Sequence, residues 1–158
     1  MSEATLIVPQ AVADKLPEGS GKAIEIIGNN QSKTINDIKI EAIAMYNLPE
    51  SAESPHIKGR GNGYIIHLGG KQFYISGDTE DIPEMRALNN IDVAFVCMNL
   101  PYTMEVDQAA SAVAEFKPAI VYPYHYRGTN GLSDVEKFKT LVNESAPEVE
   151  VRLRAWYK

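Results

Sequence analysis

Two hydrophobic runs of the sequence end in side chains that could bind a metal ion. Asp78 follows the run FYISG, and His125 lies at the end of the run VYPYHY. In layered α/β folds, ligand sites gather at strand ends, where a rigid scaffold lets side chains converge. A carboxylate and an imidazole that meet there suit a divalent cation such as zinc. Each residue also has a simpler interpretation, because Gly-Asp pairs are typical of turns and a histidine between tyrosines is typical of a hydrogen-bonded side chain.

The other two histidines lie on either side of a glycine-rich segment. His56 lies in the loop ESPHIKGRGNGY, where it could reach the same site or face solvent. His67 lies inside a hydrophobic run, and we expect it to be exposed or at a sheet edge. The pattern GRGNG resembles a phosphate-binding loop, but it precedes a strand and opens no helix, so that interpretation fails. Lys58 and Arg60 in this loop could still attract an anionic substrate.

The elements that must position these residues are strands and helices in alternation. Strands are predicted near the N-terminus, in AIEII and from Ile38 onward, with a short helix after Pro9. Residues 47–63 contain two prolines, three glycines and no periodicity, which predicts a long loop that is either functional or disordered. Gly69-Gly70 predicts a two-residue hairpin turn.

The second half continues with helix, strand, helix, strand, helix and strand. The last helix is predicted to begin after Ser133, a good N-cap residue. The segment VEVRLRAWY alternates polar and apolar residues and is predicted to be a strand that runs to the end. Together these patterns predict an α/β fold with helices packed on a sheet.

Length and charge narrow the classes of function. A chain of 158 residues has the size of one domain, and its formal net charge of −6 argues against a nucleic-acid partner held by phosphate contacts. No apolar run approaches the roughly 20 residues that a membrane span requires. The N-terminus lacks the pattern of a signal peptide, so we expect a cytoplasmic protein. Cys97 lies in the buried-strand pattern VAFVCMNL without a cationic neighbour, which indicates a core residue and not a nucleophile.

Three stretches together resemble the metallo-β-lactamase superfamily. They are GNGYIIHLGGKQFYISGDTEDIPEM, IDVAFVCMNLPYTM and PAIVYPYHYRG, and the similarity extends from about Thr5 to the C-terminus. The branch that they resemble most is that of predicted metal-dependent hydrolases, which includes ascorbate-6-phosphate lactonase-like proteins. The resemblance implies an αββα sandwich, in which two sheets with outer helices pack face to face and a metal site lies along one edge.

The resemblance also implies roles for individual residues. Asp78 matches the aspartate that bridges the metals, and His125 matches the last histidine ligand. Two residues compete for a further ligand position: Asn47 by its place along the strand, and His56 by chemistry, since imidazole is the better ligand for zinc or manganese. We also expect three residues to contact the substrate, namely Tyr102, Arg127 and Asn47.

One family motif has no counterpart in the sequence. The cluster His-x-His-x-Asp-His supplies most ligands of the first metal in the family, and residues 1–50 contain no histidine. We therefore expect residues 1–158 to form a single, N-terminally incomplete domain, the C-terminal portion of the sandwich. The expected cofactor is a divalent metal, zinc first and manganese or iron as alternatives, bound weakly or not at all by this chain alone.

Two hypotheses of function follow from this resemblance. In the first, the parent protein is a hydrolase whose metal-activated water attacks an ester, lactone, amide or phosphoester of a small molecule, while this chain alone is inactive. In the second, the chain is a noncatalytic fragment or interaction module that has lost the metal site.

Loss of one sheet would expose the apolar face of the other, which predicts a homodimer or association with the missing N-terminal half.

Overall fold

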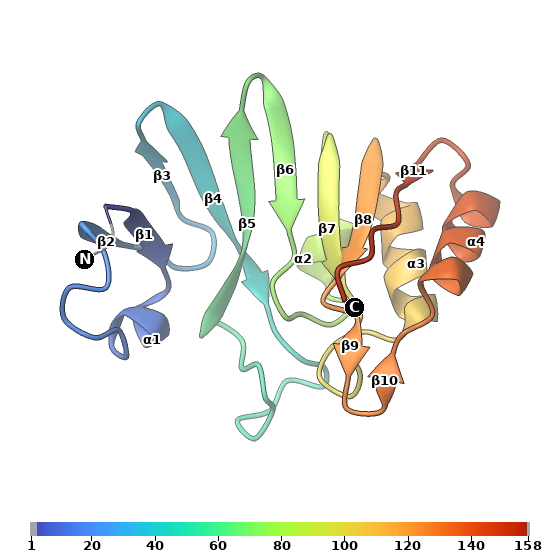
Figure 1. The fold of residues 1–158 in the computed structure, drawn as a ribbon, viewed down its shortest axis with the longest axis horizontal. Helices are drawn as coiled ribbons and strands as arrows, with labels where there is room; N and C mark the ends of the chain where they lie inside the picture. The colour runs from blue at the N-terminus through green and yellow to red at the C-terminus, as the bar shows by residue number, and fades with distance from the viewer. Residues whose placement is uncertain (1–2, 158) are drawn as a thin grey trace.

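The computed structural model describes residues 3–157 and confirms an α/β fold with a mixed sheet (Figure 1). The four helices of the described chain are α1 Gln10–Ala13, α2 Pro83–Arg86, α3 Val106–Phe116 and α4 Val135–Ser145. The strands are β1 Thr5–Val8, β2 Ala23–Ile26, β3 Ser32–Ile35, β4 Ile38–Met45, β5 Gly61–Leu68, β6 Lys71–Ile75, β7 Val93–Cys97, β8 Ile120–Tyr124, β9 Arg127–Gly128, β10 Gly131–Leu132 and β11 Glu150–Val151.

Seven of these strands form one sheet in the order β11-β8-β7-β6-β5-β4-β3. The strands from β3 to β6 pair antiparallel, and those from β6 to β8 and β11 pair parallel. The predicted hairpin turn joins β5 to β6, where Gly69 and Gly70 have positive φ angles of 59° and 73°. Such angles fit the primed turns that match the twist of a hairpin.

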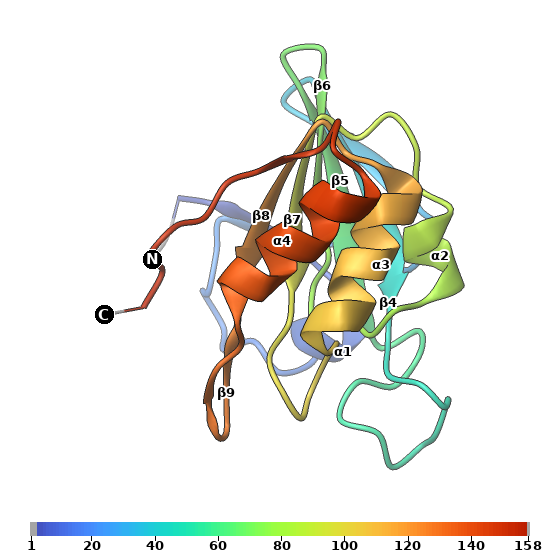
Figure 2. The same ribbon diagram turned by 90° about the vertical axis from the view of Figure 1, so that its right-hand side faces the viewer.

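All three helices that connect the parallel strands cover the same face of the sheet. Each new parallel strand is added on the same side of the previous one, so right-handed crossovers bring α2, α3 and α4 to one face (Figure 2). Side chains on that face are fully buried, among them Tyr74, Val96 and Val121. This covered face contains most of the hydrophobic core.

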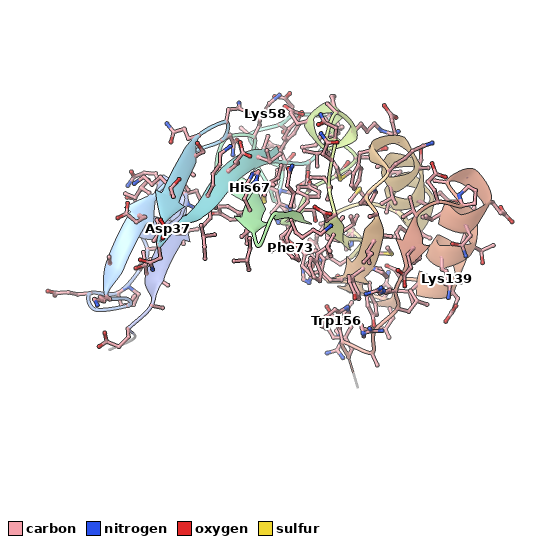
Figure 3. The ribbon with its side chains drawn as sticks, turned by 90° about the horizontal axis from the view of Figure 1, so that it is seen from above. Asp37, Lys58, His67, Phe73, Lys139 and Trp156 are labelled. Atoms are coloured by element: carbon pink, nitrogen blue, oxygen red, sulfur yellow. The ribbon has the colours of Figure 1, made fainter. Side chains whose placement is uncertain are left out.

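The opposite face of the sheet, which we call the open face, carries no helix (Figure 1). Its central row pairs Tyr64 with Ile75, Ile75 with Phe95, and Phe95 with Tyr122 across four neighbouring strands. These side chains are only half-buried, and Phe95 stacks on Tyr122 with ring centroids 5.3 Å apart. Phe73 and Trp156 lie on this side in the view from above (Figure 3). The open face is therefore apolar and incompletely covered.

Three local predictions were wrong. The C-terminal strand ends at Val151, because the following aromatic residues leave the ladder and pack on β8, with the Trp156 indole N–H donating to the Pro123 carbonyl. The N-cap of α4 is Asp134, whose carboxylate accepts from the Lys137 N–H, while Ser133 donates to the Met98 carbonyl.

His67 was the third error, because it lies on β5 between β4 and β6 and not at a sheet edge. Its half-buried ring faces the carboxylate of Glu41, with 2.5 Å between Nε2 and Oε1. Cys97, in contrast, is fully buried as predicted, and burial raises the pKa of its thiol. Within residues 3–157, no helix has the length and hydropathy needed to span a membrane.

Candidate metal centre

The turn after β6 sets the direction of Asp78. Gly77 precedes it with a φ of +64°, and a Cβ atom at this position would lie 2.8 Å from the Asn62 carbonyl oxygen and 3.0 Å from the Met45 sulfur. The chain therefore turns here in a conformation and a space that suit glycine. Ser76 holds the same turn, since its hydroxyl accepts from the Cys97 N–H and donates to the Gly77 carbonyl.

His56 and His125 lie on either side of the Asp78 carboxylate. The distance from His125 Nε2 to Asp78 Oδ1 is 3.4 Å, and that from His56 Nε2 to Asp78 Oδ2 is 3.6 Å. The exposed fractions of the side chains are 20% for His56, 39% for Asp78 and 40% for His125. The structure thus brings the three predicted ligands together, with one carboxylate oxygen facing each imidazole.

The loop that carries His56 is ordered by the buried side chain of Asn47. The backbone N–H of His56 donates to Asn47 Oδ1, and the backbone N–H of Asn47 donates to the His56 carbonyl, both at 2.9 Å. The Asn47 amide N–H groups donate to Glu80 Oε1 at 3.0 Å and to the Tyr102 carbonyl at 2.8 Å. All these partners are protein groups, so Asn47 acts in this structure as a brace between three loops.

Lys58 ties the same loop to α2. Its ammonium group lies 2.9 Å from Glu50 Oε1 and 3.5 Å from Glu84 Oε1, and 4.4 Å from the centre of the Tyr46 ring. The hydrogen bond to Glu50 and that to the Tyr46 hydroxyl raise the pKa of Lys58. The ammonium group is therefore used within the protein, and it is less available to a substrate than the sequence suggested.

His125 is positioned by its backbone. It directly follows β8 and has a φ of +44°, in the left-handed region that residues other than glycine adopt uncommonly. The preceding residue, Tyr124, packs edge-on against Phe95, with 6.4 Å between ring centroids. Burial is the main cause that raises the pKa of the Tyr124 phenol.

Two hollows flank the three residues. The first has a volume of about 470 Å³ and is lined by Asp78, His125, Phe95, Tyr124, Trp156 and Tyr157. The second has a volume of about 300 Å³ and lies on the side of His56, next to α1. Trp156 and Tyr157 were not anticipated as lining residues, because their alternating pattern indicated a strand.

The donor types match those of a divalent metal site. Zinc accepts carboxylate oxygen and imidazole nitrogen, and the Nε2 atoms of both histidines face the Asp78 oxygens. Within residues 3–157, however, no group of three or more His, Cys, Asp or Glu side chains is arranged so that it could hold a metal ion. The role of the three residues as ligands stays a prediction.

The two other predicted substrate contacts have partners elsewhere. The Tyr102 hydroxyl accepts from the Thr129 hydroxyl at 3.1 Å. The guanidinium of Arg127 lies 4.5 Å from the centre of the Tyr157 ring, and Tyr157 lines the larger hollow. Arg127 is therefore connected to the candidate site through Tyr157. Tyr102 is connected to it through Asn47, whose side-chain amide donates a hydrogen bond to the Tyr102 carbonyl.

Comparison with known proteins shows what the chain is similar to. A family model described as "Beta-lactamase superfamily domain" matches residues 7–125. A UPF0173 metal-dependent hydrolase from Pyrococcus abyssi is 30% identical over 160 residues, covering 96% of this chain and 69% of the relative. Another from Pyrococcus furiosus is 34% identical over 134 residues, covering 81% of this chain and 59% of the relative.

Solved structures show the same similarity. A putative metal-dependent hydrolase from Parabacteroides distasonis has a TM-score of 0.84 and 38% identity, over 98% of this chain and 66% of that one. Igni18, a metallo hydrolase from Ignicoccus hospitalis, has a TM-score of 0.76 and 26% identity, over 96% of this chain and 65% of that one. The metallo-beta-lactamase fold protein YhfI from Bacillus subtilis, at 11% identity and a TM-score of 0.71, shares the fold.

The chain spans about three fifths to two thirds of the length of these relatives. The closer resemblance to ascorbate-6-phosphate lactonase-like proteins stays a prediction. The family itself is shown by the match over residues 7–125 and by the similarity to the hydrolase from Pyrococcus abyssi. The chain therefore belongs to the metallo-β-lactamase superfamily and is a relative of its UPF0173 metal-dependent hydrolases.

Proposed function

We propose that Asp78, His125 and His56 contribute part of the divalent-metal site of a hydrolase. The observation that carries this proposal is the placement of two imidazoles at 3.4 and 3.6 Å from the two oxygens of one carboxylate at a strand end. The names of the relatives as metal-dependent hydrolases support it. Zinc is the metal we expect first, because it accepts both donor types, with manganese and iron as alternatives.

The residues of the chain would divide the work of the site. A divalent ion bound there would act as a Lewis acid and lower the pKa of a water molecule. Asp78, whose direction is fixed by the Gly77 turn, would hold the ion together with the two imidazoles that face its oxygens. The aromatic walls of the larger hollow would orient a small-molecule ester, lactone, amide or phosphoester and exclude bulk water.

In this proposal, the remaining ligands come from polypeptide other than residues 3–157. The chain would then be the C-terminal, ligand-bearing portion of a sandwich domain, with weak metal binding on its own. The alternative is a noncatalytic fragment or interaction module that retains the scaffold without the metal chemistry. Metal binding to the isolated chain separates these two functions.

The test is a calorimetric titration of the purified chain with zinc and with manganese chloride. We expect weak, saturable zinc binding that decreases at least tenfold in Asp78→Asn and in His125→Gln. His67→Gln is the matched control, because His67 also lies beside a carboxylate but belongs to β5, with Glu41 as its partner. Unchanged affinity in Asp78→Asn, or an equal loss in His67→Gln, would contradict the proposal. Complete absence of binding would favour the noncatalytic alternative.

We also propose that the open face is covered by a further segment of polypeptide. The support is its half-buried aromatic row and the greater length of the relatives, of which the chain spans 69% and 59%. Light scattering on the isolated chain tests this proposal. We expect a monomer that associates weakly through the open face, and less so in Phe95→Lys. A stable dimer disrupted by Phe95→Lys would show that a second copy covers the face instead.

A further inference from the structure

The smaller hollow beside His56 is a preformed pocket with apolar walls. Its volume is about 300 Å³, at the lower end of the range for small-molecule sites. It lies between α1 and the start of β5, which are neighbours at the lower left of Figure 1. The apolar walls are formed by Ala11, Val12, Leu16, Met45, Pro55 and Ile57.

The α1 side of the pocket is fixed to the main sheet. The Tyr64 hydroxyl donates to the Ile7 carbonyl at 3.2 Å, and the Asn62 amide donates to the Ile27 carbonyl at 2.8 Å. The strands β1 and β2 pair parallel in a separate two-stranded sheet. The two hydrogen bonds hold this pair, and with it α1, against β5. The walls are therefore in place before any ligand arrives, which reduces the ordering that binding would require.

Two cations without partners line this pocket. Nearly all Lys and Arg side chains of residues 3–157 have an ion pair, a hydrogen bond or an aromatic ring as partner; the exceptions are Lys15, Arg60 and Lys139. Lys15 and Arg60 both belong to the pocket. In a chain with a net charge of −6, carboxylates are plentiful, so two free cations in one apolar pocket are available to an external anion.

Two further features of the pocket favour an anion. Its lining includes no Asp or Glu among the described residues, so no carboxylate there would repel one. His56 lines the pocket as well, and its buried Nδ1 atom has no partner among residues 3–157. Charge and apolar surface thus occur together in one place next to the candidate metal centre.

We propose that this pocket binds a small amphipathic anion. Its carboxylate or phosphate headgroup would interact with Lys15 and Arg60, and its apolar body would pack on Val12, Leu16 and Ile57. Only one part of this inference rests on the proposed function, namely that the anion is a substrate or product of the centre at Asp78. The binding itself depends on the pocket alone.

The experiment is a titration of the isotope-labelled chain followed by NMR, with octanoate and octyl phosphate below their micelle concentrations. We expect saturable shifts in residues 11–16 and 56–61, and the stronger of the two probes identifies the preferred headgroup. Octanol, which lacks the charge, and acetate, which lacks the apolar body, should bind at least tenfold more weakly. The double variant Lys15→Gln with Arg60→Gln should lose at least tenfold in affinity for the anions.

Lys139→Gln is the matched control, because Lys139 is also an unpaired cation but lies on α4 (Figure 3). Its affinity for octanoate should equal that of the unchanged protein. Equal binding of octanol and octanoate, shifts confined to the open face, or full affinity in the double variant would overturn the inference. Asp78→Asn separates the two proposals: it should lower zinc affinity at least tenfold and leave octanoate binding intact.

Discussion

His56 and His125 reach the same carboxylate by opposite structural means. His56 lies in a long loop whose position depends on side chains, above all on Asn47, which bonds to its backbone N–H. His125 directly follows a strand of the sheet, and its ring is directed by a left-handed backbone conformation. The His56 side chain is also the more buried of the two.

This difference indicates which kind of substitution would displace each histidine. A loop held by side-chain hydrogen bonds can be displaced by a substitution at a distance from the histidine. A residue held by strand pairing and an unusual φ angle responds instead to changes in its own backbone preferences. Three sets of substitutions test this comparison, in order of decreasing effect.

The largest effect is expected from Asn47→Ala. This change leaves the His56 N–H and the Tyr102 carbonyl without their buried partner, which should lower the free energy of unfolding by about 3 kcal/mol. Urea denaturation measures this loss, and the His56 ring resonance should shift while that of His125 does not. Asn89→Ala is the control, because Asn89 is exposed, and it should change stability by less than about 0.5 kcal/mol. Equal effects of the two substitutions would contradict the bracing role of Asn47.

A smaller effect on stability is expected when glycine and alanine substitutions are compared at the two histidine positions. At position 125, Gly should be more stable than Ala by about 1 kcal/mol, because only Gly adopts a φ of +44° without steric penalty. At position 56, which is not among the described residues with positive φ, Ala should be more stable than Gly by about 0.5 kcal/mol. Thermal unfolding of the four variants measures both differences. The same order at both positions would show that the backbone does not distinguish them.

The smallest effect concerns the pH dependence of the His56 loop. Burial alone would raise the pKa of Glu84, but hydrogen bonds from its backbone, Tyr46 and Lys58 outweigh it and lower the pKa. A lowered pKa in the folded state stabilises the protein above the unfolded value of about 4.3, and this contribution is lost as the pH falls through the folded pKa.

Glu84→Gln should therefore destabilise the protein by less than about 1 kcal/mol at pH 7, since the pair is partly exposed. The difference from the unchanged protein should shrink toward pH 3, and urea denaturation at several pH values measures it. A difference that grows on acidification would contradict the lowered pKa. Glu53→Gln is the control, because Glu53 lies in the loop of His56 and is exposed.

Features that depend on local sequence were predictable. The hydrophobic runs before Asp78 and His125 indicated strand ends, and Gly69-Gly70 indicated the hairpin that aligns β5 with β6. Chemistry favoured His56 over Asn47 as a candidate ligand, and the structure places His56 beside Asp78 while Asn47 bonds to backbone groups and to Glu80. The strand ends and the hairpin needed only strand patterns, whereas the choice between His56 and Asn47 also needed the family resemblance, which supplied the ligand position.

Features that depend on contacts between distant segments were not predictable. The hollow at Asp78 is lined by Trp156 and Tyr157, which follow β11 outside the sheet. The free cations at Lys15 and Arg60 are recognised only when the partners of every other cation are known. Lys58 and Arg60 lie two residues apart, yet only the former meets acidic residues, because the fold brings Glu84 to the loop from α2.

The buried thiol of Cys97 provides a natural reporter of motion at Asp78. It is the only cysteine in the chain, and its sulfur donates to the Thr79 carbonyl at 3.4 Å, directly after the candidate ligand. Because the thiol is buried in the structure, a maleimide reacts only after a local or global opening exposes the sulfur. The labelling rate of the unmodified protein would thus report openings of the structure around Asp78, without any engineered probe.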